Sequence, residues 1–309
     1  MRTVFLGTSE FAAGLLTRLV GEREQADSYA PTLVLTRPDR HAGRGRKLAS
    51  PPVADRARAL GLKLAQPESV NEPAVRELIA DLCPDAMIVC AFGALVKEPL
   101  LSDYEMLNVH PSLLPRWRGA APIERAIMAG DERTGVSIMR LTAGLDSGPV
   151  CLSASEPIHP DDTFGSLAGR LELAGGDLLL SALRTLDRGE TLTFAEQDER
   201  QVTYAEKIGP TDRLLDPARP AIELERVVRA LSPHIGARAA LSDGSLLGVQ
   251  RAAPAMLPAS DAGEGVHVRD GRLLLDCVED VLELLEVQPP GKRPMAAEAF
   301  LRGHGLPSS

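Results

Sequence analysis

Short apolar runs alternate with helical stretches along the first 110 residues of the chain. The runs at 2–7, 32–36, 85–91 and 105–110 are predicted strands, and the run at 32–36 is consistent with a strand buried on both faces. Between them, residues 10–20, a stretch after the Pro51-Pro52 pair and residues 71–82 are predicted helices. This alternation predicts an α/β fold with a doubly wound, mostly parallel, Rossmann-like sheet.

The other elements expected in this first domain are spaced less regularly along the sequence. We expect residues 62–64 to form a short strand, and Asn71 to cap the helix that runs to Leu82. Residues 37–50, rich in Arg and Gly, are expected to form an exposed loop. Further strands are predicted at 135–141 and 150–158, followed by a long helix from Thr163 to about Leu186.

The pattern changes near residue 189. Apart from one predicted helix at 221–231, the C-terminal part consists of short apolar pieces separated by turn signals such as Asp243-Gly244 and Asp270-Gly271. The pieces lie at 239–241, 246–249, 265–268, 273–277 and 282–287. We therefore expect a catalytic domain at 1–189, an extended linker at 190–206 and a small β-barrel, OB-like domain at 207–309.

Composition excludes several classes of protein. The chain has 309 residues, 44% of them hydrophobic, and a net charge of −9. Its apolar runs are too short for a membrane span or a signal peptide, so we expect a cytoplasmic protein without a membrane partner. The four cysteines show no C-x-x-C spacing and no accompanying cluster of histidines, and we therefore expect no bound metal.

An amide and an imidazole stand two residues apart at the end of the predicted strand 105–110. Asn108 and His110 point to the same face of an extended strand, and Pro111 should end it. The carboxyl ends of strands are where open α/β sheets bind ligands. An amide can stabilise an oxyanion and an imidazole can move protons, so the pair suits acyl chemistry. The alternative is a strand end followed by a structural, partly buried histidine.

A second cluster, at residues 142–149, follows the predicted strand 135–141. Its glycines and proline form a tight loop around Asp146, which could orient an imidazole or could simply form a turn. No G-x-S-x-G, Walker A or dinucleotide-binding glycine pattern is present. Asn, His and Asp without a covalent nucleophile favour direct transfer of a one-carbon acyl group to an amine.

Positive charge is concentrated between residues 36 and 58 of this acidic chain. This segment contains seven cationic residues and only two carboxylates, Asp39 and Asp55. The cations are Arg37, Arg40, Arg44, Arg46, Lys47, Arg56 and Arg58. Such a run is either a solvated surface or a site that binds phosphates.

These motifs resemble the formyltransferase family that uses 10-formyltetrahydrofolate. The superfamily resemblance lies in Asn108-x-His110, the segment 112–115 and Asp146 in its loop. The segments 36–48, 115–123 and 203–208 are similar to the methionyl-tRNA branch of the family. The resemblance covers nearly the whole chain.

The resemblance implies roles for individual residues. Asn108 would polarise the formyl oxygen, His110 would help to transfer protons, and Asp146 would orient His110. The folate co-substrate, 10-formyltetrahydrofolate, would lie against two groups of residues. These are Ser112, Leu113, Leu114 and Pro115 in one loop, and Val89, Cys90, Phe92, Gly93 and Leu141 around it. No metal is implied.

The resemblance also implies a nucleic-acid partner, methionyl-initiator tRNA. Its phosphates would be bound by the basic segment, through Arg40, Arg44, Arg46 and Lys47. We expect the protein to act as a monomer.

Three alternatives remain open from the sequence. The same catalytic residues would serve a formyltransferase acting on an amino sugar, or a formyl-folate hydrolase. A tRNA-binding module without catalysis is the second alternative. A nucleotide-dependent Rossmann enzyme is the third, although the first strand is followed by a single glycine, Gly7.

Overall fold

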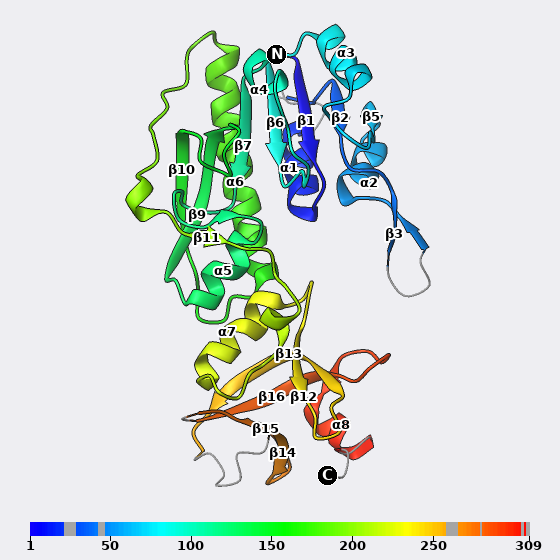
Figure 1. Ribbon diagram of the computed structural model, residues 1–309, viewed down its shortest axis with the longest axis vertical. Coiled ribbons are helices and arrows are strands. Elements are labelled where there is room, and N and C mark those ends of the chain that lie inside the picture. Colours follow the sequence, from blue (N-terminus) through cyan, green and yellow to red (C-terminus); the bar gives the residue numbers. More distant parts are fainter. Residues whose placement is uncertain (22–28, 43–46, 258–264, 279, 304–305, 307–309) are drawn as a thin grey trace. The chain divides into compact units, whose positions relative to one another are not determined.

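A computed structural model describes residues 1–21, 29–42, 47–257, 265–278, 280–303 and 306 (Figure 1). Its residues form two compact units. The first comprises 1–120, 134–156 and 168–204, and the second comprises 121–133, 157–167 and 205–309. Because these units are not continuous in sequence, the expected limits at 189 and 207 stay a prediction.

A seven-stranded sheet forms the centre of the first unit, in the order β10-β9-β7-β6-β1-β2-β5. The strands are β1 Thr3–Gly7, β2 Leu33–Leu35, β5 Leu64–Ala65, β6 Ala86–Cys90, β7 Met106–His110, β9 Arg133–Arg140 and β10 Val150–Pro157. From β7 to β5 neighbouring strands are parallel, and β9 is antiparallel to β7. The mostly parallel α/β sheet predicted from the sequence is therefore confirmed.

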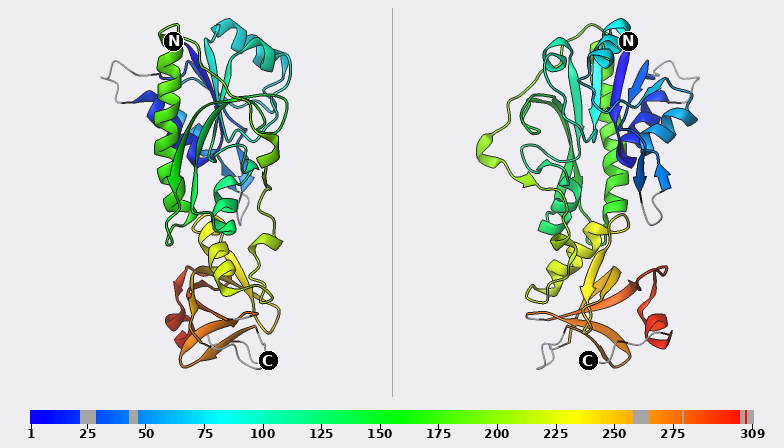
Figure 2. Two further views of the ribbon diagram at one scale, coloured as in Figure 1. Left: turned by 90° about the vertical axis from the view of Figure 1, so that its left-hand side faces the viewer. Right: turned by 45° about the vertical axis from the view of Figure 1, so that its right-hand side comes forward.

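Helices cover both faces of this sheet (Figure 2). On one face lie α1 (Glu10–Val20), which Ser9 caps, and α6 (Phe164–Asp187). The absence of a side chain at Gly175 lets α6 approach the sheet, since a Cβ there would lie 3.2 Å from Val109 and 3.3 Å from Val136. On the other face, α3 (Pro73–Leu82) packs into a core with β1, β2, β6 and Met106 of β7.

Two local predictions were wrong. The segment expected to be a loop contains a hairpin of β3 (Arg40–Ala42) and β4 (Lys47–Ala49). Glu72 precedes α3 in place of Asn71, whose amide instead bonds Leu95 and Lys97 of a distant loop. Helix α2 (Pro52–Ala59) was predicted, whereas α4 (Leu100–Asp103), α5 (Pro122–Ala129) and α8 (Ala297–Gly303) were not.

The second unit is built on an antiparallel sheet that curls on itself (Figure 1). Its strands are β12 Ala237–Ala240, β13 Leu246–Ala255, β14 Val266–Arg269, β15 Arg272–Asp276, β16 Val281–Gln288 and β17 Met295–Ala296. Helix α7 (Ala221–Leu231) packs its apolar face into the same core as β13 and β16. The curled sheet agrees with the small barrel domain predicted from the sequence.

The connection between α6 and α7 is largely extended. It contains β11 (Tyr204–Ala205), which pairs with β8 (Arg118–Gly119), and short 3₁₀ turns at Glu199–Gln201 and Thr211–Arg213. An extended connection was predicted, but the pairing of β11 with β8 was not.

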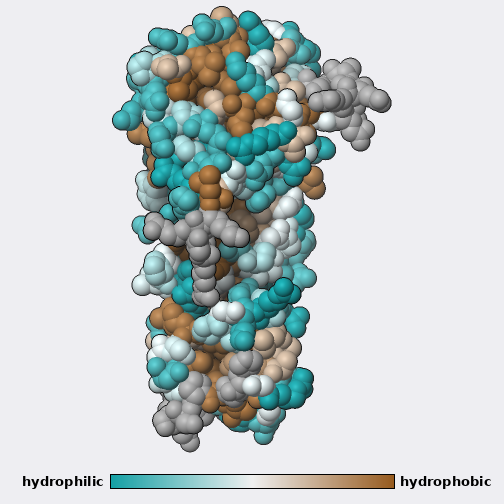
Figure 3. Space-filling view, turned by 90° about the vertical axis from the view of Figure 1, so that its right-hand side faces the viewer, coloured by the Kyte–Doolittle hydropathy of each residue, from teal (hydrophilic) through white to brown (hydrophobic). Residues whose placement is uncertain are grey.

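Hydrophobic residues reach the surface in separate areas among hydrophilic ones (Figure 3). Leu95, Leu145 and Leu173 are among the exposed large apolar side chains; the first two lie in loops and Leu173 lies in α6. Within the described residues, every helix is too short or too polar to cross a bilayer.

Candidate functional site

Asn108 and His110 lie at the carboxyl end of β7, which ends at His110 as predicted. Both are buried, with exposed fractions of 7% and 4%. They share the strand face of Met106, which belongs to the α3 core, and Val109 faces α6 instead. Parallel pairing sets Val89 of β6 directly beside Asn108. The two predicted catalytic side chains therefore lie on one face, next to a residue predicted to contact folate.

The loop after β7 fixes the orientation of the His110 ring. Nε2 lies 2.8 Å from the carbonyl oxygen of Trp117, which can only accept a hydrogen bond, so Nε2 carries a proton. Nδ1 then faces the Oδ2 atom of Asp146 at 3.7 Å. A proton on Nδ1 would point at the carboxylate, and proton exchange is therefore confined to this side of the ring.

A backbone amide of the neighbouring loop holds the Asp146 carboxylate in place. Its Oδ2 atom accepts a hydrogen bond of 2.8 Å from the Gly119 amide. Its own backbone is left-handed, with φ of 45°, a conformation that residues with a Cβ rarely adopt. The loop thus adopts an unfavourable backbone conformation that aims this carboxylate at His110.

The Asn108 amide is available to a ligand. Among the described residues, none forms a hydrogen bond with this side chain. A buried amide without a protein partner costs free energy unless a bound molecule satisfies it. The structure therefore brings Asn108, His110 and Asp146 to the end of one strand, and the catalytic role of all three stays a prediction.

The predicted folate residues of the first loop have mixed surroundings. Ser112 is fully buried, and its hydroxyl donates a bond of 2.6 Å to the Arg116 carbonyl, which closes the loop. Leu113, Leu114 and Pro115 are half-buried. Ser112 therefore shapes the loop, and its hydroxyl is already used there.

The other residues predicted to contact folate lie on β6 and in the neighbouring loops, and they differ in exposure. Val89 and Phe92 are each 5% exposed, whereas Gly93 is exposed and Leu141 is half-buried. Cys90 is fully buried, which raises the pKa of its thiol. The Cys90 side chain is therefore closed off from solvent. Folate binding by this set stays a prediction.

The structure describes part of the predicted tRNA-binding set. Arg40 lies on β3, and its exposed guanidinium forms an ion pair of 2.9 Å with Glu68. Lys47 lies on β4, whereas Arg44 and Arg46 lie outside the described residues.

Sequence reasoning missed the residues that hold the loops together. Gln197 and Thr203, in the segment expected to be a plain linker, hydrogen-bond the loops that carry Asp146 and Trp117. Arg118 is buried, at 3% exposure, and bonds both Gln197 and Glu199. A polar residue in an extended linker carries no periodic signal, so only the fold could identify these contacts.

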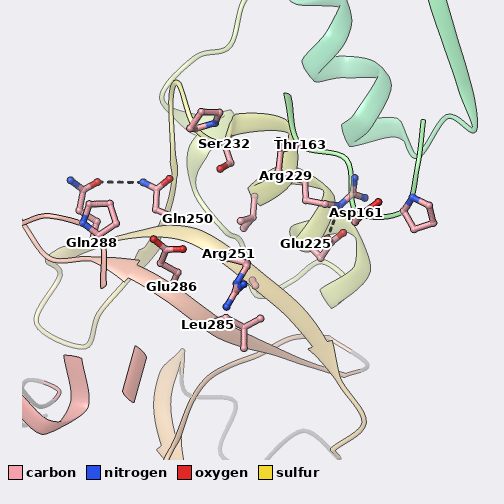
Figure 4. A pocket seen from close by; sticks show the side chains of 15 residues that line it. Asp161, Thr163, Glu225, Arg229, Ser232, Gln250, Arg251, Leu285, Glu286 and Gln288 are labelled. Atoms are coloured by element: carbon pink, nitrogen blue, oxygen red, sulfur yellow. Dashed lines mark hydrogen bonds and ion pairs between the residues drawn. The ribbon is translucent and has the colours of Figure 1, made fainter. Parts of the chain in front are cut away.

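The second unit contains a cavity of about 960 Å³ (Figure 4). It is bounded by the loop at Asp161, by α7 and by β13 and β16, and Gln250 and Gln288 hydrogen-bond at its edge. None of the predicted site residues lines it. Within the described part of the chain, no cluster of side chains is suited to hold a metal ion.

Comparison with known proteins defines the class. Residues 1–183 match the formyl transferase family model, and residues 207–305 match that of the formyl transferase C-terminal domain. The chain therefore belongs to the formyl transferase family and is a formyl-transferring enzyme.

Full-length relatives place it within that family. The chain is 44% identical to the methionyl-tRNA formyltransferase of Methylococcus capsulatus, covering 99% of this chain and 98% of the relative. It is 41% identical to that of Halorhodospira halophila, covering 99% and 97%. The chain thus groups with the methionyl-tRNA formyltransferases, as the sequence motifs predicted.

Solved structures share the fold at low identity. HypX from Aquifex aeolicus in complex with tetrahydrofolic acid has a TM-score of 0.63 at 18% identity, covering 97% of this chain and 47% of HypX. The sugar 3N-formyl transferase WlaRD has a TM-score of 0.65 at 13% identity, covering 95% and 99%. At these identities the likeness concerns the fold alone.

Proposed function

We propose that this enzyme transfers the formyl group of 10-formyltetrahydrofolate to the amino group of methionyl-initiator tRNA, giving N-formylmethionyl-tRNA for translation initiation. Its relatives carry the name of that activity, and a protein of the same fold binds tetrahydrofolic acid. The observation that carries the proposal is the His110 ring, held between the Trp117 carbonyl and the Asp146 carboxylate at the end of β7, beside Asn108.

The reaction forms one bond and breaks another. The amine nitrogen bonds to the formyl carbon, the bond from that carbon to the folate nitrogen breaks, and a proton passes in net from the amine to the folate nitrogen. No covalent intermediate on the protein is needed. The protein has to stabilise charge on the formyl oxygen and to move a proton.

Three side chains supply these functions. The Asn108 amide would donate to the formyl oxygen as negative charge develops there. His110 would exchange protons through Nδ1, because Nε2 is engaged by the Trp117 carbonyl. Asp146 would stabilise the proton on Nδ1 and keep the ring in place, at a distance of 3.7 Å. General acid–base catalysis of this kind contributes about 10²–10⁴-fold.

We expect the basic segment to bind the tRNA. A chain of net charge −9 must concentrate its cations locally to bind an RNA, and Arg40, Arg44, Arg46 and Lys47 do so in sequence. Contacts from these side chains to phosphates, together with recognition of RNA shape, would supply affinity.

One assay tests the proposal. The purified protein is given 10-formyltetrahydrofolate with methionyl-initiator tRNA, a nucleotide-linked amino sugar, or no acceptor. We expect formylation of the tRNA and little turnover in the other two reactions. Preferential formylation of the sugar, or hydrolysis of the folate regardless of acceptor, would overturn the proposed acceptor.

A further inference from the structure

We propose that Gln197 is a positioning residue for Asp146 and that the segment 195–203, here called the strap, holds the catalytic loop in its active geometry. The inference deepens the proposed function and rests on it. Gln197 lies outside every residue group to which the motifs assign a role, in a stretch that the sequence predicts to be a linker.

The Gln197 amide grips the Asp146 loop at two points. Nε2 donates one hydrogen bond of 2.8 Å to the Asp146 carbonyl and another of 2.7 Å to the Gly148 carbonyl. The two amide hydrogens thus bracket Ser147 and fix the loop on both sides of it. This contact holds the left-handed backbone of Asp146, which has φ of 45°.

Arg118 sets the orientation of that amide. Its Nε atom donates a bond of 3.0 Å to Oε1 of Gln197, so the amide nitrogen must face the loop carbonyls. Glu199, also on the strap, accepts from the two terminal nitrogens of the same guanidinium. Arg118 is 3% exposed, and these acceptors offset the cost of removing its guanidinium from water.

The strap also bonds the loop that holds the other side of His110. The hydroxyl of Thr203 accepts from the Trp117 amide at 2.9 Å, and its carbonyl accepts from the Arg118 amide at 2.9 Å. At the opposite end of the strap, Ala195 and Val150 exchange two backbone bonds of 2.9 Å. The strap therefore connects the two loops between which His110 is held.

The catalytic consequence follows from geometry. Asp146 Oδ2 is 3.7 Å from His110 Nδ1 and 2.8 Å from the Gly119 amide, so a small displacement of the loop removes one contact or both. A misplacement of about 1 Å in an active site can reduce turnover by about 10²-fold. Gln197 touches no reacting atom in this scheme and acts only through Asp146.

Two variants and one control test this role. Gln197→Ala removes both hydrogen bonds to the loop carbonyls. Gln197→Glu keeps an acceptor for Arg118 but supplies no donor to those carbonyls. Gln201→Ala is the matched control, because Gln201 lies on the same strap and bonds only Asp198, away from the loop. We expect kcat for formyl transfer to fall about 10-fold to 100-fold in both Gln197 variants, with KM for tRNA little changed and no loss in the control.

A double-mutant cycle separates positioning from general stability. In an Asp146→Asn background, Gln197→Ala should lower kcat further by less than about twofold, because its effect passes through Asp146. An equal loss in both backgrounds would overturn the positioning role, as would a Gln197→Glu enzyme with normal kcat.

Hydrogen exchange tests the strap independently of catalysis. The peptide that covers residues 142–149 should exchange faster in both Gln197 variants than in wild type or Gln201→Ala. Unchanged exchange would overturn the inference even if the enzyme formylates tRNA. If the wild-type protein proves inactive on methionyl-tRNA but the Gln197 variants still exchange faster, the role of the strap in holding the loop is supported and the proposed acceptor is rejected.

Discussion

The Trp117 carbonyl accepts a hydrogen bond of 2.8 Å from Nε2 of His110, and this bond decides which ring nitrogen is left for chemistry. Trp117 can present its carbonyl in this way because its backbone is left-handed, with φ of 66°. The ring is thereby turned so that Nδ1 faces Asp146. An indole-bearing residue thus contributes to the candidate site through its backbone, whatever its side chain does.

The first prediction concerns the proposed catalytic groups. Asn108→Ala should lower kcat about 10²–10³-fold, the usual effect of removing one oxyanion donor. Asp146→Asn keeps the size of the side chain but removes the charge that faces Nδ1, and should lower kcat at least as much. Steady-state kinetics on methionyl-tRNA give both values.

The control for these variants is the fold. Both proteins should unfold within a few degrees of wild type, because Asn108 has no described hydrogen-bond partner and asparagine can still accept from the Gly119 amide. Near-normal turnover in either folded variant would remove that residue from the mechanism.

Much of the first unit could be predicted because the apolar runs and helix caps in its sequence match the strands and helices that the structure buries. Strand β6 is apolar throughout and buried on both faces, and α1 begins at a serine whose side chain caps it. The spacing of Asn108 and His110 was sufficient to place them on one strand face, since strand geometry alternates strictly. The approach of Asp146 to His110 followed from the family resemblance, and the structure agrees at 3.7 Å.

The remaining features depend on contacts between distant residues. The hairpin of β3 and β4 forms in a segment whose charge and glycines indicate an open loop. Asn71 could have capped α3, but its amide stabilises the loop at Leu95 and Lys97 instead. Gln197 bonds residues about 50 positions away in the chain, and no local pattern identifies such a partner.

The second prediction tests the packing of the loop that carries Asp146. A Cβ added at Gly148 would lie 1.9 Å from the Arg140 carbonyl oxygen, which is backbone and cannot easily move. Gly148→Ala should therefore destabilise the protein by about 1–3 kcal/mol. Denaturant unfolding of the purified variant provides the measurement.

Gly169→Ala is the matched control for that substitution. Gly169 lies inside α6, and a Cβ there would meet nothing within 4 Å. Because alanine favours helix and reduces the freedom of the unfolded chain, this variant should gain about 0.4–1 kcal/mol. Equal losses at both glycines would mean that the clash at Gly148 is not what limits stability.

The third prediction concerns an ion pair of the second unit and its pH dependence. The Arg125 guanidinium forms two hydrogen bonds with Asp212, at 2.9 Å and 3.1 Å, and holds the pKa of that carboxyl below its usual value. A lowered folded-state pKa stabilises the fold at neutral pH, and this contribution is lost as pH falls through the folded-state value. Arg125→Met should therefore cost about 1–2 kcal/mol at pH 7.

The pH series distinguishes charge from packing. The difference in unfolding free energy between wild type and Arg125→Met should narrow below about pH 4, where Asp212 becomes protonated in the unfolded chain. Arg219→Met is the control, because its pair with Glu223 is 41% exposed on each side and should contribute little. A difference that stays constant from pH 7 to pH 3 would assign the loss to packing alone.

The last prediction tests whether the basic segment binds RNA phosphates. Replacing Arg44 and Lys47 together by alanine should raise KM for methionyl-tRNA and leave kcat nearly unchanged, since neither residue belongs to the catalytic groups. For each cation that binds a phosphate, its removal should also reduce the slope of log KM against log salt by about 1. Arg188→Ala removes the same kind of charge from an exposed pair with Glu190 and serves as the control. If the double variant and Arg188→Ala show the same slope of log KM against log salt, net charge alone explains any change in KM. The segment would then be a solvated surface and not a binding site.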